Sequence, residues 1–94
     1  MKTITIINKL VKWSGGEFMS HKLIDNDGTY KDLRFTKGLD EKLKESALKV
    51  ESGKFTITCG DKDLWLCKKD FKTKQELKYP RYYLNDIKEY NKVD

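Results

Sequence analysis

The segment Asp25-Asn26-Asp27-Gly28 constrains the fold more than any other feature of this chain. Asp, Asn and Gly accept the positive φ angles that tight turns need, so this run predicts a turn. Residues 18–24 before it and residues 29–36 after it predict strands, and the second run alternates apolar with polar side chains. The chain is therefore expected to build an antiparallel sheet around this hairpin.

The other predicted strands cover residues 3–13, 54–59, 64–67 and 81–90. The first is rich in β-branched residues and the second alternates apolar with polar side chains, and both patterns favour strands. In the first strand the apolar residues change phase between Ile6 and Ile7, which predicts a bulge near Asn8. Pro80 disfavours a central strand position, because proline has no N–H to donate.

Residues 38–50 predict one helix, because one apolar stripe is formed by Leu39, Leu43, Ala47 and Val50. This helix would lie between the third and fourth strands. The element order resembles that of the OB-fold, a small Greek-key barrel that binds oligonucleotides on one strand face and its adjacent loops. The predicted fold class is α+β, either a small, strongly bent antiparallel sheet or an OB-like barrel of five or six strands.

The length of 94 residues predicts a single domain over residues 1–94. Charged residues make up 37% of the chain and aromatic residues 12%, so a folded protein with a small core and a charged surface is expected. Asn8, Lys9 and Lys12 interrupt the apolar N-terminal run, and no segment has the length of a membrane helix. These patterns predict a cytoplasmic protein with no membrane partner.

Most of the net positive charge lies in residues 68–83. This segment has six cationic and two acidic residues, a local charge of +4, against +5 for the whole chain. Residues 68–78 lack periodicity and predict a long basic loop. The expected phosphate contacts are Lys68, Lys69, Lys72, Lys74, Lys78 and Arg81, and the expected stacking rings are Phe71, Tyr79 or Tyr83. The alternative is a solvated loop whose lysines keep the protein soluble and whose rings pack in the core.

Tyr30, Arg34 and Trp65 form a second group of candidates. Tyr30 and Arg34 share one face of the predicted third strand, where an arginine can bind phosphate or stack on a base. Trp65 would offer another stacking ring, and Trp13 would lie near the mouth of a barrel. For both tryptophans the competing prediction is a place in the core, where a protein of this size needs large rings.

No motif indicates catalysis, a metal or a cofactor. The sequence has no nucleophile elbow, phosphate-binding loop, dinucleotide fingerprint or zinc-protease motif. The one histidine, His21, lies mid-strand, and together with Cys59 and Cys67 it gives too few ligands for a structural zinc site. The two cysteines are expected on neighbouring strands. We therefore expect a non-enzymatic protein without a cofactor.

Two functional hypotheses follow from these observations. The first is a small protein that binds single-stranded DNA or RNA through the basic loop and exposed aromatic rings. The alternative is an accessory or inhibitor protein of a phage or other mobile element, comparable in function to anti-CRISPR proteins, that blocks an acidic or nucleic-acid-handling partner. An edge strand such as 81–90 could also pair with a partner or with a second copy in a homodimer.

Overall fold

The computed structural model describes residues 1–70 and 72–93. Within these residues, seven strands and two short helices follow one another as β1 (Lys2–Trp13), β2 (Gly16–Ile24), β3 (Tyr30–Phe35), α1 (Lys37–Lys42), α2 (Ala47–Val50), β4 (Gly53–Cys59), β5 (Leu64–Lys69), β6 (Glu76–Leu84) and β7 (Glu89–Val93). The helices lie between the third and fourth strands, as predicted. No helix in the described part of the chain has the length and apolar character needed to cross a membrane.

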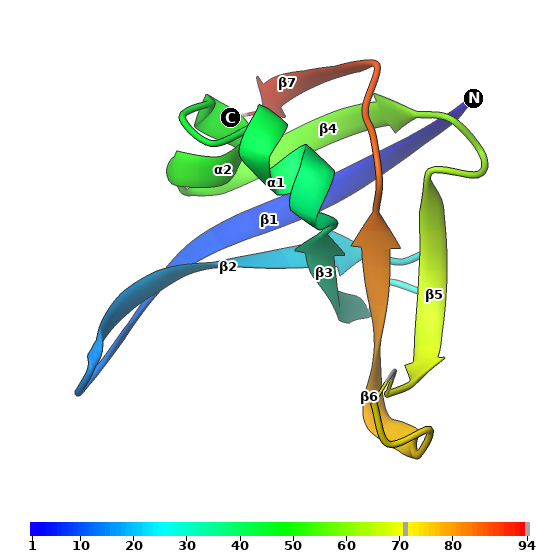
Figure 1. Ribbon diagram of the computed structural model, residues 1–94. Helices are drawn as coiled ribbons and strands as arrows, with labels where there is room; N and C mark the ends of the chain where they lie inside the picture. Colours follow the sequence, from blue (N-terminus) through cyan, green and yellow to red (C-terminus); the bar gives the residue numbers. More distant parts are fainter. Residues whose placement is uncertain (71, 94) are drawn as a thin grey trace.

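The seven strands form one open, mixed sheet in the order β5-β6-β3-β2-β1-β4-β7. β3 and β6 run parallel, while the other neighbours are antiparallel. In Figure 1, β3, β5 and β6 run across the direction of β1 and β4, so the sheet bends strongly. The α+β class is confirmed, but the sheet is mixed and not antiparallel as predicted, because β3 and β6 run parallel, and the alternative prediction of an OB-like barrel is wrong. β6 lies between β5 and β3, and β5 and β7 are the strands at the two opposite ends of the sheet.

The predicted hairpin at Asp25–Gly28 is confirmed. β2 and β3 pair from Lys22 with Asp32 to Ile24 with Tyr30. The Gly28 N–H donates to the Asp25 carbonyl at 2.9 Å, and the φ angle of Gly28 is +82°, which a residue without Cβ adopts without strain. The turn residues therefore set the register of this hairpin.

The predicted bulge near Asn8 is absent. β1 pairs without interruption with β2 from Thr5 to Trp13, and with β4 from Lys2 to Asn8. Asn8 instead keeps the strand regular by taking a core position, where it is 2% exposed. A polar residue occupies this inward position because its amide finds hydrogen-bond partners there, and Ile7 then points to the other side of the sheet.

The predicted helix over residues 38–50 is two short helices. α1 ends at Lys42 and α2 begins after Ser46, whose hydroxyl donates to the Leu43 carbonyl at 3.0 Å. A serine that binds the backbone in this way offers it an alternative to continuing the helix. The buried stripe consequently shifts from Val50, which is 55% exposed, to Leu48, which is fully buried.

The helices cover one face of the sheet, which we call the core face. A single cluster of buried side chains fills it: Ile6, Leu23, Leu33, Leu39, Leu43, Leu48, Phe55, Ile57, Cys59, Leu64 and Leu84. Because side chains alternate along a strand, the residues between these positions point to the opposite face, which we call the outer face.

The predicted strand over residues 81–90 is wrong in extent. Residues 81–84 belong to β6, which lies inside the sheet between β5 and β3, and residues 89 and 90 begin β7. The interior position of β6 removes the predicted edge at residues 81–84. The two end strands in the described part of the chain are β5 and β7.

The β1–β2 hairpin projects from the body of the protein as a two-stranded arm over residues 9–20 (Figure 1). β4 pairs with β1 only as far as Asn8, and β3 pairs with β2 only from Lys22 onward. Trp13 lies near the tip of this arm and is 61% exposed, so it neither enters the core nor lines a barrel mouth. Its ring closely approaches Gly15, where a Cβ atom would overlap the indole.

Candidate functional site

Three predicted site residues form a row across three neighbouring strands of the outer face. Arg34 of β3 lies opposite Tyr83 of β6, and Tyr83 lies opposite Trp65 of β5. The Trp65 and Tyr83 rings stack with centroids 6.1 Å apart and planes inclined by 17°. Trp65 is 40% exposed and Arg34 is exposed, so the row presents an indole face and a guanidinium to solvent. We call Arg34, Tyr83 and Trp65 the aromatic row.

The strand pattern explains why these side chains face outward. Their chain neighbours Leu33, Leu84 and Leu64 are buried in the core. Alternation along each strand therefore directs Arg34, Tyr83 and Trp65 to the outer face. The competing prediction that Trp65 packs in the core is thus not met.

The basic segment is a hairpin and not the predicted long loop. Lys68 and Lys69 end β5, the described residues 70 and 72–75 belong to the turn, and β6 begins at Glu76. The Asp70 carboxylate shapes this turn by accepting the Lys72 N–H at 2.7 Å and the Thr73 N–H at 3.1 Å through Oδ1. These two N–H donors, and more weakly the nearby Arg81, lower the pKa of Asp70. An Asx-type turn of this kind fixes the backbone conformation next to the aspartate.

Pro80 lies in β6 at an irregular part of the ladder. Cys67 pairs with Arg81 but Lys69 pairs with Glu76, so residues 77–80 have no ladder partners on β5. The missing N–H of proline therefore costs no ladder hydrogen bond here. Tyr79 projects from this irregularity with 71% exposure, and the Lys78 ammonium lies 5.5 Å from the centre of its ring.

The cations of the basic segment have no ion-pair partner within 4.0 Å in the part of the chain that the structure describes. They are Lys68, Lys69, Lys72, Lys74, Lys78 and Arg81. Five lysines elsewhere are paired with carboxylates: Lys22, Lys31, Lys42, Lys49 and Lys92. The positive charge beside the aromatic row is therefore left uncompensated by such pairs.

Two other predicted site residues are not part of the aromatic row. Tyr30 shares the outer face of β3 with Arg34, as predicted, but stands four residues away, roughly 13 Å along a strand. Asp32 lies between them and pairs with Lys22 at 2.5 Å. Phe71 falls outside the described residues.

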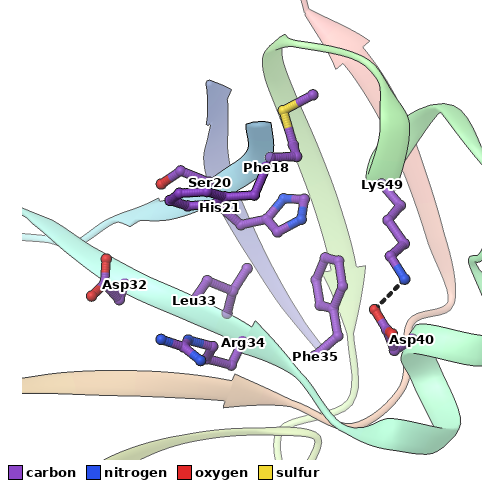
Figure 2. A pocket seen from close by; sticks show the side chains of 10 residues that line it. Phe18, Ser20, His21, Asp32, Leu33, Arg34, Phe35, Asp40 and Lys49 are labelled. Atoms are coloured by element: carbon purple, nitrogen blue, oxygen red, sulfur yellow. Dashed lines mark ion pairs between the residues drawn. The ribbon is translucent and has the colours of Figure 1, made fainter. Parts of the chain in front are cut away.

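A second feature of the structure is a cleft of about 500 Å³ between β2 and β3, beyond the point where these strands stop pairing. Figure 2 shows His21 and Phe35 facing each other across this cleft, with the Asp40–Lys49 ion pair at one end. The His21 and Phe35 ring centres are 4.7 Å apart. Sequence reasoning assigned His21 no role, because an isolated histidine within a strand carries no motif.

A hydrogen-bond network fixes the His21 ring. Asn8 Nδ2 donates to the Leu48 carbonyl at 2.6 Å and to the Glu51 carbonyl at 3.1 Å. Asn8 Oδ1 is then left as an acceptor, 2.6 Å from His21 Nδ1, so His21 Nδ1 carries the proton. The network joins both strands of the arm base to the end of α2. Burial, together with the nearby Lys49 charge, lowers the pKa of His21 below its ordinary value.

This lowered pKa predicts that the folded state loses stability on acidification. Above about pH 6.5 His21 is neutral in both states, whereas below it the unfolded chain binds a proton that the folded state accepts less readily. The free energy of unfolding is therefore expected to fall between pH 7.5 and 5.5, as measured by urea denaturation. His21→Gln keeps an amide donor for Asn8 and should remove this dependence. An unchanged pH dependence in that variant would show that another group causes it.

The two cysteines do not lie on neighbouring strands, contrary to the prediction. Cys59 of β4 is buried in the core, where burial raises the pKa of its thiol, and Cys67 of β5 pairs with Arg81 on the outer face. In the sheet, β4 and β5 are separated by β1, β2, β3 and β6. Both thiols are free, and the described residues contain no cluster of three or more potential metal ligands.

Comparisons with protein families, with curated proteins and with solved structures find no match to this chain.

Proposed function

We propose that this protein binds single-stranded nucleic acid, DNA or RNA, on the outer face of β3, β6 and β5. The observation that supports this most directly is the aromatic row with an exposed indole face, lying beside cations that form no ion pair within 4.0 Å among the described residues. Binding of single strands with little sequence preference requires two elements, aromatic rings on which bases stack and a positively charged surface along the backbone.

Binding on this surface would proceed in two steps. The cations of the β5–β6 hairpin attract the phosphate backbone over a distance of about one Debye length. A base then stacks on the exposed face of Trp65, while Arg34 at the other end of the row contacts a phosphate or a second base. An unstacked base is needed for the second step, which favours single strands over duplexes. Every base has a π face, so sequence preference is expected to be slight.

The proposed activity is binding without catalysis. The row and the hairpin offer stacking surfaces and positive charge, which are the features that binding uses. The test is fluorescence anisotropy with labelled single-stranded and duplex DNA and RNA at low and at physiological salt. Micromolar or tighter binding to single strands that persists in part at physiological salt supports the proposal. Equal binding to duplexes that vanishes at physiological salt would indicate only a generic cationic surface.

The contribution of stacking is tested by Trp65→Ala. Loss of one stacked base is expected to cost about 1–3 kcal/mol, or roughly 5- to 150-fold in affinity. Phe18→Ala is a matched control, because Phe18 is also an exposed aromatic residue (52%) but lies on the arm. Titration of both variants against the same single strand measures the difference. Equal losses in the two variants would contradict a specific role for Trp65.

A partner-blocking protein is the second candidate function, and the exposed arm favours it. Leu10, Trp13 and Phe18 are 42%, 61% and 52% exposed on a ribbon that only two strands support. Exposed apolar side chains gathered on one projection are typical of protein interaction sites. Such a protein would act as an inhibitor from a phage or mobile element, comparable to anti-CRISPR proteins. Loss of activity on Trp13→Ser with unchanged nucleic-acid binding would favour this candidate.

A further inference from the structure

A smaller cleft of about 240 Å³ adjoins the aromatic row on the outer face. It lies within the β5–β6 hairpin and is lined by Cys67, Lys69, Asp70, Lys72, Leu77, Arg81 and Tyr83. Tyr83 belongs to both the cleft and the row. A ligand in this cleft would therefore lie next to a base stacked on Trp65.

Arg81 lines this cleft, and its side chain has an unused hydrogen-bond donor beneath the cleft surface. Its Nε atom is buried and has no hydrogen-bond partner in residues 1–70 and 72–93. Buried polar groups are nearly always paired, and an unpaired donor on a charged group costs free energy. Arg81 also has no ion-pair partner within 4.0 Å among the same residues. Its guanidinium thus has unfilled capacity for an acceptor, which an anion would supply.

We propose that this cleft is a phosphate-binding site, which we call the seat. The Arg81 guanidinium binds the phosphate there, with Lys69 and Lys72 beside it. The planar fork of a guanidinium matches two phosphate oxygens at once, and a phosphate that draws this group toward the cleft mouth gives Nε its missing acceptor. Where the phosphate belongs to a nucleic-acid strand, the seat rests on the proposed function. It then fixes one backbone position next to the base on Trp65.

Asp70 sets the strength of this seat. Its Oδ1 is held by the N–H groups of Lys72 and Thr73, so the carboxylate shapes the hairpin turn while placing a negative charge in the cleft. That charge repels a phosphate. An asparagine at this position keeps an oxygen for both N–H donors and removes the charge. Asp70→Asn is therefore expected to tighten phosphate binding severalfold without loss of the turn.

The variants Arg81→Lys and Asp70→Asn test the seat from opposite sides. Arg81→Lys keeps the charge but removes the fork, and a roughly tenfold weaker affinity for a labelled single-stranded oligothymidylate is expected. Lys62→Arg is the matched control, because it exchanges the same two side chains at an exposed cation outside both the cleft and the basic hairpin, and it should leave the affinity unchanged. Thermal melts of each variant confirm that the fold is retained.

The second readout is the Nε–Hε resonance of Arg81 in NMR spectra of the wild-type protein, followed during titration with inorganic phosphate, tripolyphosphate or the oligothymidylate. A saturable shift with the oligothymidylate, together with tighter binding by Asp70→Asn, supports a seat for a backbone phosphate. A shift with tripolyphosphate or phosphate while no oligonucleotide binds supports a seat for free phosphate compounds and contradicts the proposed function.

Two results would overturn the seat. If the oligothymidylate binds and quenches tryptophan fluorescence while the Arg81 resonance does not move, the seat is wrong and the proposed function stands. If none of the three probes moves the resonance, or if Arg81→Lys binds as tightly as the wild type, the seat is likewise wrong.

Discussion

Replacement of Lys69, Lys72 and Lys74 by glutamate is expected to abolish binding to single-stranded nucleic acid. These exposed lysines end β5 and form the adjoining turn, and ion pairs with described carboxylates do not neutralise them. Reversal turns attraction into like-charge repulsion, which costs several kcal/mol. That corresponds to a loss of more than about 100-fold in affinity. Anisotropy titration of a labelled single strand at several salt concentrations measures this loss.

A matched control separates local charge from total charge. Lys37, Lys44 and Lys62 are exposed and lie outside the basic hairpin, so their replacement by glutamate changes the net charge by the same amount. This control should keep most of the affinity and most of the salt dependence, whereas each lost phosphate contact lowers the salt slope by about 0.7. Equal weakening by both triple variants would show that net charge alone drives binding, and the hairpin would then have no special role.

Asn8→Ala is expected to produce the largest loss of stability among single polar substitutions on the core face. The change leaves the Leu48 carbonyl without its buried donor and removes both the Glu51 contact and the acceptor of His21 Nδ1. Each buried polar group left unpaired costs about 1–3 kcal/mol. A loss of about 2–4 kcal/mol in the free energy of unfolding follows for the network as a whole.

Urea denaturation at pH 7.5 measures this cost, and Asn91→Ala provides the control. Asn91 is exposed on the end strand β7, so its replacement should change stability by less than about 0.5 kcal/mol. A comparable effect of the two substitutions would show that the Asn8 network contributes nothing beyond ordinary strand packing.

Local sequence patterns predicted the elements that depend on neighbours in the chain. The Asp25–Gly28 turn chemistry defined the β2–β3 hairpin, and alternation in residues 54–59 gave β4. The prediction of a bulge near Asn8 is wrong because the alternation of apolar and polar residues treats every polar residue as outward-facing. Its partners, Leu48 and Glu51, lie 40 and 43 residues away along the chain, and no local signal reports them. A bulge was therefore inferred where a buried amide keeps the strand regular.

The candidate site was predictable as a set of residues but not as an arrangement. Charge density marked the basic segment, and Arg34, Trp65 and Tyr83 were each candidates by residue type. Their meeting in one row depends on the parallel pairing of β3 with β6, which periodicity cannot reveal. The predicted barrel failed for the same reason, since closure is decided by which distant strands pair. The unpaired Nε of Arg81 likewise has no counterpart in the sequence.

The parallel β3–β6 pairing also affects the order in which this protein can fold. The hairpins β1–β2 and β5–β6 join strands close in sequence, so they can form early, whereas β3 and β6 must close a long loop that contains α1, α2, β4 and β5. Long-range parallel pairing of this kind is slow to form. During synthesis Arg34 leaves the ribosome well before Tyr83 does. The aromatic row is consequently assembled at a late step, and a ligand that needs the whole row would bind and stabilise only chains that have completed that step.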